Sequence, residues 1–123
     1  MKSLILVIED NEQNLYLMRF LLEKNGFTVI EATDGISGVE LAKKEKPDLI
    51  LLDIQLPRMD GYSVAREIKN NAVLNKTPIV AVTSYAMAGD RERAIASGAD
   101  GYIEKPIDPE KFIEQITKHL KTL

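Results

Sequence analysis

Residues 49–53 read Leu-Ile-Leu-Leu-Asp, a continuous apolar run that ends in a carboxylate. A short run of this kind is typical of a strand that lies inside a parallel sheet, covered on both faces. Three more apolar runs lead to polar side chains: residues 4–8 before Glu9-Asp10, residues 79–82 before Thr83, and Tyr102-Ile103 shortly before Lys105. If the four runs are neighbouring parallel strands, their polar residues meet at one edge of the sheet.

The rest of the chain alternates between predicted strands and predicted helices. Apolar runs rich in Ile, Val and Leu predict strands at residues 3–8, 28–32, 49–53, 79–83 and 101–104. Between and after them, apolar residues at helical spacing mark five helices, at residues 15–22, 36–42, 64–68, 94–96 and 112–120. Asp34 and Asp108 are candidate N-caps, and Pro109 suits the first helical position.

This order of elements indicates an α/β fold. Strands that alternate with helices imply right-handed crossovers and a parallel sheet with helices on both faces. We therefore expect a flavodoxin-like (βα)5 fold, a doubly wound five-stranded sheet in the order 2-1-3-4-5. The 123 residues are enough for one core and too few for two, so residues 1–123 are expected to form a single domain.

Composition and charge exclude several classes of function. The net charge is −3 with no basic stripe, which argues against direct nucleic-acid binding. No apolar run approaches the roughly 18 residues of a membrane span, and the first residues lack the pattern of a signal peptide. The chain contains no cysteine, which is compatible with a reducing compartment. A cytoplasmic location without membrane contact is expected.

The polar residues at the predicted sheet edge suit a divalent cation. Mg²⁺ takes oxygen ligands, usually one or two carboxylates together with several waters, and Mn²⁺ accepts similar donors. Asp10 and Asp53 would supply two carboxylates, Glu9 would hold a metal-bound water, and the backbone carbonyl of Gln55 would complete the set. Without the cation, the three carboxylates repel one another, which should raise at least one pKa.

Asp53 is the best candidate for a nucleophile at this edge. Carboxylates form aspartyl-phosphate intermediates, and phosphoryl transfer depends mainly on positioning and charge neutralisation. Lys105 would neutralise charge from one side, and the Thr83 hydroxyl would donate to a phosphoryl oxygen. The site therefore predicts a phosphoacceptor.

These motifs resemble the receiver domain of two-component response regulators over the whole chain. The resemblance implies that Asp53 is phosphorylated by a histidine kinase or a histidine phosphotransfer protein. It also implies a Mg²⁺-binding acidic pair (Glu9 and Asp10), a switch hydroxyl (Thr83), a phosphoryl contact (Lys105), a switch aromatic (Tyr102) and a cis bond before Pro106. The matching segments are Val7-Ile8-Glu9-Asp10-Asn11, residues 46–53, Leu56-Pro57-Arg58-Met59-Asp60-Gly61, residues 78–83 and Lys105-Pro106.

Within that family, residues 53–57 and 83–92 are similar to two groups. One is the stand-alone cell-division regulators of the DivK type, and the other is the receivers of hybrid sensor kinases. The chain ends after the fifth predicted helix, which favours the stand-alone type. The resemblance implies a downstream protein target that binds the face formed by the fourth predicted helix, the fifth strand and the fifth helix. Exposed candidates on this face are Tyr85, Met87, Arg91, Glu92, Tyr102 and Lys111.

Three other functions compete with this interpretation. A small aspartyl-phosphate phosphatase would need a second aspartate two positions after the nucleophile, where this chain has Gln55. A flavin carrier would need a neutral phosphate loop, whereas residues 9–12 read Glu-Asp-Asn-Glu. A phosphorylation-independent adaptor would not need the complete acidic set with Lys105. We therefore expect a switch and not an enzyme, with at most self-catalysed phosphorylation and dephosphorylation.

Overall fold

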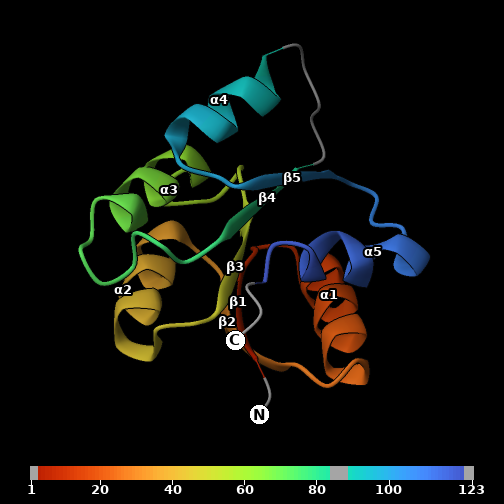
Figure 1. Cartoon of the computed structure of the whole chain (residues 1–123). Coiled ribbons are helices and arrows are strands. Elements are labelled where there is room, and N and C mark those ends of the chain that lie inside the picture. The colour runs from red at the N-terminus through yellow and green to blue at the C-terminus, as the bar shows by residue number, and fades with distance from the viewer. Residues whose placement is uncertain (1–2, 84–88, 121–123) are drawn as a thin grey trace.

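Five parallel strands form one sheet in the order β2-β1-β3-β4-β5, which confirms the predicted fold class (Figure 1). The computed structural model describes residues 3–83 and 89–120. Each strand lies within about one residue of its predicted position. The strands are β1 (Leu4–Ile8), β2 (Thr28–Ala32), β3 (Leu49–Asp53), β4 (Ile79–Thr83) and β5 (Gly101–Glu104).

Helices follow the strands in strict alternation. They are α1 (Glu12–Lys24), α2 (Gly35–Glu45), α3 (Gly61–Lys69), α4 (Asp90–Ser97) and α5 (Pro109–Thr117). The predicted caps are present: Asp34 accepts a hydrogen bond from the Ser37 amide at the start of α2, and Asp108 accepts one from the Glu110 amide at the start of α5. Such caps satisfy amide groups that the first helical turn leaves without partners.

The sheet separates two apolar cores. One core lies between the sheet and helices α2, α3 and α4, and contains Leu6, Leu52 and Ala81. The other lies under α1 and α5, on the opposite face of the sheet, and contains Val7, Leu51 and Phe112 (Figure 1). Because successive residues of a strand point to opposite faces, β1, β3 and β4 need apolar residues at nearly every position.

The C-terminal helix is shorter than the sequence suggested. Helix α5 ends at Thr117, so His119 and Leu120 follow the helix, although the apolar pattern had placed Leu120 within it. His119 packs across Gly101 of β5, where a Cβ atom on the glycine would collide with the imidazole ring. None of the helices in the described ranges is both long and apolar enough to cross a membrane.

Candidate functional site

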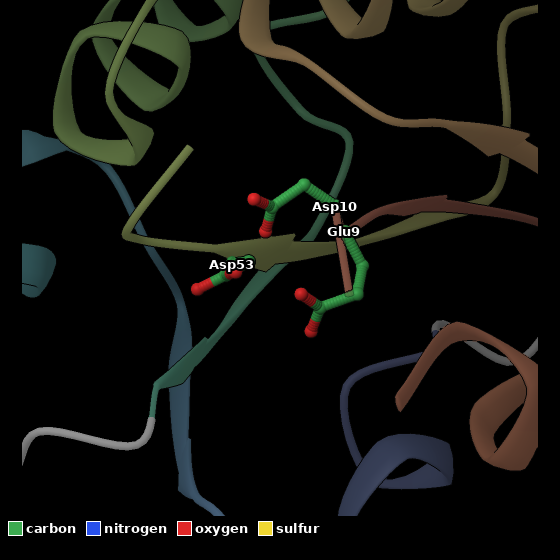
Figure 2. A group of neighbouring side chains, drawn as sticks. All are labelled: Glu9, Asp10 and Asp53. Atoms are coloured by element: carbon green, nitrogen blue, oxygen red, sulfur yellow. The ribbon is translucent and has the colours of Figure 1, made fainter. Parts of the chain in front are cut away.

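Three carboxylates gather where β1 and β3 end. Ile8 and Leu52 are register partners in adjacent strands, so Glu9 and Asp53 emerge side by side. Figure 2 shows Glu9, Asp10 and Asp53 grouped at this edge, and one oxygen from each lies within 4.8 Å of the others. Glu9 and Asp53 are buried, whereas Asp10 is exposed. Register therefore produces the acidic cluster that the sequence predicted.

Glycine at the start of α3 lets that helix begin directly against the end of β3. A Cβ atom on Gly61 would lie 2.5 Å from the Ile54 Cα and 2.6 Å from the Asp53 carbonyl oxygen. The Gly61 amide instead donates to the Ile54 carbonyl at 2.8 Å. This close approach fixes the backbone around Asp53, a role of Gly61 that the motif alone did not specify.

Lys105 enters the cluster from the end of β5. Its ammonium lies 2.5 Å from Glu9 Oε1 and 3.7 Å from Asp53 Oδ2, and its side chain is only 8% exposed. The Gln55 amide donates to Asp53 Oδ1 at 3.0 Å, and the Asn11 amide donates to Glu9 Oε2 at 3.2 Å. The Lys105–Glu9 contact is an ion pair without hydrogen-bond alignment, so Glu9 Oε1 has no hydrogen-bond donor among the described residues.

The cluster perturbs the titration of Asp53. Burial, followed by hydrogen bonding and repulsion from Glu9, raises the pKa of Asp53 from its ordinary value to about 7. The Gln55 amide and Lys105 act in the opposite direction, because both favour the ionised form. The sequence predicted that the crowding of three carboxylates would raise at least one pKa, without saying which.

The donor set fits a hard divalent cation. Mg²⁺ prefers oxygen ligands and retains water. Here the buried Asp53 carboxylate, the exposed Asp10 carboxylate and the buried Glu9, whose Oε1 has no hydrogen-bond donor among the described residues, converge. One lysine offsets only part of three carboxylate charges, so a bound cation would relieve the remaining repulsion. The chemistry of the donors therefore agrees with the predicted metal site.

Thr83 and Lys105 are joined through the backbone. Thr83 is the last residue of β4 and is buried, and its carbonyl accepts a hydrogen bond from the Lys105 amide at 2.8 Å. The Lys105–Pro106 peptide bond is cis. Asp53 pairs with Val82 in the sheet, so Thr83 lies one step beyond Asp53 at the same edge. The structure thus brings all the predicted site residues except Tyr102 to one place.

Tyr102 lies apart from the acidic cluster and differs from the prediction of an exposed aromatic. It sits in β5, is only half-buried, and packs its ring against the core under α3 and α4. Its hydroxyl is buried. Arg91, Glu92 and Lys111 are exposed as expected, and Tyr85 and Met87 lie outside the described residues.

A second group of residues near the site was not found from the sequence. A pocket of about 460 Å³ lies beside Thr83, and Gln55, Tyr62, Asp90 and Arg93 line it. Tyr62 belongs to α3, whereas Asp90 and Arg93 belong to α4. The only signal in the sequence is the Asp90–Arg93 spacing of three, which places both side chains on one face of a helix.

The fold and the site define a class: a doubly wound α/β protein with an acidic cluster and a buried lysine at the carboxyl ends of its parallel strands. A sequence model of the response regulator receiver domain matches residues 5–117. The chain is 42% identical over 120 residues to the polar-differentiation response regulator DivK of Brucella anthropi, covering 98% of each chain. The protein belongs to the response regulator receiver domain family.

Solved structures agree with this assignment. The receiver domain of the sensor histidine kinase PA1611 from Pseudomonas aeruginosa is 34% identical with a TM-score of 0.89, and the match covers 96% of this chain and 97% of that one. That receiver holds a magnesium ion in its active-site cleft. The chemotaxis regulator CheY4 of Vibrio cholerae shares the fold, with 24% identity, a TM-score of 0.92, and coverage of 98% of this chain and all of that one.

The raised pKa of Asp53 predicts that Mg²⁺ binding depends on pH. A cation competes with the proton on Asp53, so the affinity for Mg²⁺ should rise as pH increases through about 7 and then level off. Titration calorimetry at several pH values would measure this. Asp53→Asn should abolish the step near neutrality, and a step of the same size in that variant would assign the titration to another group.

Proposed function

We propose that this protein is a Mg²⁺-dependent phosphoacceptor that takes a phosphoryl group on Asp53. The observation that supports the proposal most strongly is the contact set of Asp53. One of its oxygens accepts from the Gln55 amide at 3.0 Å, the other faces Lys105 at 3.7 Å, and two further carboxylates stand beside it. Glu9, Asp10, Asp53 and the Gln55 carbonyl would hold the cation. This oxygen-rich arrangement, once a cation joins Lys105 in neutralising its charge, suits in-line displacement at phosphorus.

The reaction is a transfer from a phosphohistidine of a histidine kinase or histidine phosphotransfer protein. A carboxylate oxygen of Asp53 attacks the phosphorus, the phosphorus–nitrogen bond breaks, and the donor histidine retains the electron pair. A cation held by these residues would supply charge neutralisation for the transferred phosphoryl group. Lys105 exchanges its contact with Asp53 for one with a phosphoryl oxygen, and the Thr83 hydroxyl donates to another.

The product is the protein phosphorylated on Asp53, which acts as a switch, and not a released metabolite. Any turnover is limited to self-catalysed phosphorylation and dephosphorylation of Asp53. Phosphorylation can shift a two-state surface only by interacting differently with the two states. The proposed readout is the face of α4, β5 and α5, which a downstream protein in the cytoplasm would bind. In this proposal the receiver unit spans residues 1–123, close to the 5–117 of the family match.

Beryllofluoride, a stable mimic of a phosphoryl group, tests the switch. With Mg²⁺ present, it should change amide chemical shifts around Asp53 and also along α4 and β5. Asp53→Asn is the matched control, because it keeps the size of the side chain and removes the charge. Shifts confined to residues that touch the acidic cluster would contradict the proposed coupling, even if binding is tight.

A further inference from the structure

The loop between β3 and α3 rests on the first turn of α2. This loop spans residues 54–60 and contains Gln55, whose carbonyl belongs to the proposed ligand set of the cation. The Pro57 carbonyl accepts a hydrogen bond from the Gly35 amide at 3.3 Å. A Cβ atom on Gly35 would collide with the Met59 carbonyl oxygen and would lie 2.7 Å from the Met59 Cβ. Glycine at the start of α2 therefore lets the loop touch the helix backbone directly.

An ion pair joins the same two segments. Arg58 Nη1 lies 3.4 Å from Oδ2 of Asp34, the residue that caps α2. Asp34 is held in place, because its carboxylate also accepts hydrogen bonds from the Ser37 amide at 2.8 Å and the Ser37 hydroxyl at 2.9 Å. An exposed ion pair contributes little alone, and the Arg58 side chain is 58% exposed, so the pair acts together with the backbone contact. We call the contacts of Asp34 and Gly35 with residues 57–59 the α2 anchor.

Arg58 has a strained backbone. Its φ is 70°, in the left-handed region that residues with a side chain rarely adopt. The Met59 amide donates to the Pro57 carbonyl at 2.8 Å and closes a three-residue turn around Arg58. A turn of this type with a positive φ at its centre is rare and strained. The loop therefore needs contacts from outside to keep this shape, and the α2 anchor supplies them at the strained residue itself.

The strained turn lies close to Gln55 along a stiff stretch of chain. Before the turn, the Gln55 amide donates to Asp53 Oδ1 at 3.0 Å, which fixes the start of the loop. Leu56 and Pro57 follow, and the proline ring fixes one of the backbone angles that precede Arg58. Leu56 also packs against the core under α2, α3 and α4. A change in the backbone at Arg58 therefore reaches the Gln55 carbonyl.

We propose that the α2 anchor positions a ligand of the cation. Asp34 and Gly35 are positioning residues that hold the strained turn, and the turn keeps the Gln55 carbonyl in place for Mg²⁺. The proposal rests on the proposed function, which assigns that carbonyl to the cation. Coupling of this kind is reciprocal: if the anchor strengthens Mg²⁺ binding, Mg²⁺ must strengthen the anchor by the same factor.

Amide hydrogen exchange measures the effect of the cation on the anchor. The Gly35 and Met59 amides both donate to the Pro57 carbonyl, and neither residue belongs to the acidic cluster. Saturating Mg²⁺ should slow their exchange about two- to tenfold, as expected for coupling equivalent to one hydrogen bond. The Gly26 amide, which donates to the Glu23 carbonyl in the turn after α1, is the reference and should be unchanged.

Two substitutions at Arg58 test the role of the strain through the affinity for Mg²⁺, measured by titration calorimetry. Arg58→Gly and Arg58→Ala remove the same charge, so any long-range electrostatic effect on the cation is equal in both. Glycine adopts a positive φ without strain, whereas alanine does not, so Arg58→Gly should bind Mg²⁺ about three- to tenfold more tightly than Arg58→Ala. Asp34→Asn should weaken binding more in wild type than in Arg58→Gly, where glycine keeps the turn without the anchor.

The outcomes separate this proposal from the metal site on which it rests. If Arg58→Gly and Arg58→Ala bind Mg²⁺ equally, or if Mg²⁺ leaves exchange of the Gly35 amide unchanged, the metal site stands and the positioning role of the α2 anchor is refuted. If wild-type protein binds no Mg²⁺, the proposed metal site fails and the positioning role fails with it.

Discussion

Replacing Lys105 with methionine should destabilise the metal-free protein by about 3–5 kcal/mol, as expected when one partner of a buried ion pair is removed. Lys105 is the cation that contacts both Glu9 and Asp53, and Glu9 is completely buried. Without it, the buried Glu9 carboxylate loses its compensating cation. Chemical denaturation without Mg²⁺ measures the loss directly.

A second substitution, at the buried Glu9, separates the effect of lost charge compensation on stability from the effect of lost packing. The double variant Lys105→Met with Glu9→Gln should regain most of the stability, because it leaves no uncompensated charge at Glu9. Lys111→Met is a matched control, since Lys111 is exposed on α5 and should cost little. If Lys105→Met lowered the free energy of unfolding no more than Lys111→Met, Lys105 would not compensate the negative charge of the acidic cluster.

Asp53→Asn should have the opposite effect and stabilise the metal-free protein by about 1–3 kcal/mol at about pH 8. Asparagine keeps the shape of the side chain and removes a charge that burial and Glu9 make unfavourable. In wild type, millimolar Mg²⁺ should raise the melting temperature, because a ligand that binds only the folded state stabilises it. In Asp53→Asn that increase should be much smaller. Thermal melts with and without Mg²⁺ provide both comparisons.

The pH dependence of this difference has a definite sign. The pKa of folded Asp53 is raised above its unfolded value, so the stability that Asp53 contributes is fully present below about pH 4. That contribution is lost as pH rises through about 7. The advantage of Asp53→Asn over wild type should therefore be absent in acid and grow toward neutrality. A difference that stays constant between those limits would show that Asp53 is not the crowded group.

The fold could be predicted because the signals that determine it are local. The apolar runs at residues 4–8, 49–52 and 79–82 are too continuous for an amphipathic surface element, and capping residues such as Asp34 and Asp108 stand where helices begin. Right-handed crossovers then imply helices on the faces of a parallel sheet, and five such strands suit the order 2-1-3-4-5. The end of α5 was predicted less accurately. Leu120 continues the apolar spacing beyond Thr117, although the helix ends at Thr117.

The acidic site could be predicted because parallel strands bring their carboxyl ends to one edge. Asp53 ends a strand, and Glu9 and Lys105 directly follow one, which fixes their neighbours once the strand order is known. The direction of the pKa change of Asp53 followed from the same charges. That burial is the main cause of the raised pKa could be seen only in the packed structure, where Asp53 is buried and Asp10 is exposed.

The interface between α3 and α4, where Arg93 covers the Tyr62 ring, could not be predicted in the same way. Its contacts depend on how α4 packs against α3, and neither helix encodes its partner in its own sequence. Tyr102 shows the same limit: alternation in β5 places it on the side of the sheet that α3 and α4 cover, but its partial burial depends on how those helices pack. Residues that act between elements therefore require the tertiary structure.

In the proposed function, a carboxylate oxygen of Asp53 accepts the phosphoryl group. Acetyl phosphate carries a transferable phosphoryl group, so incubation with this donor and Mg²⁺, followed by intact-protein mass spectrometry, tests the claim without a kinase. Wild type should gain the mass of one phosphoryl group, and Asp53→Asn should gain none. An unlabelled wild type, or equal labelling of Asp53→Asn, would contradict the account.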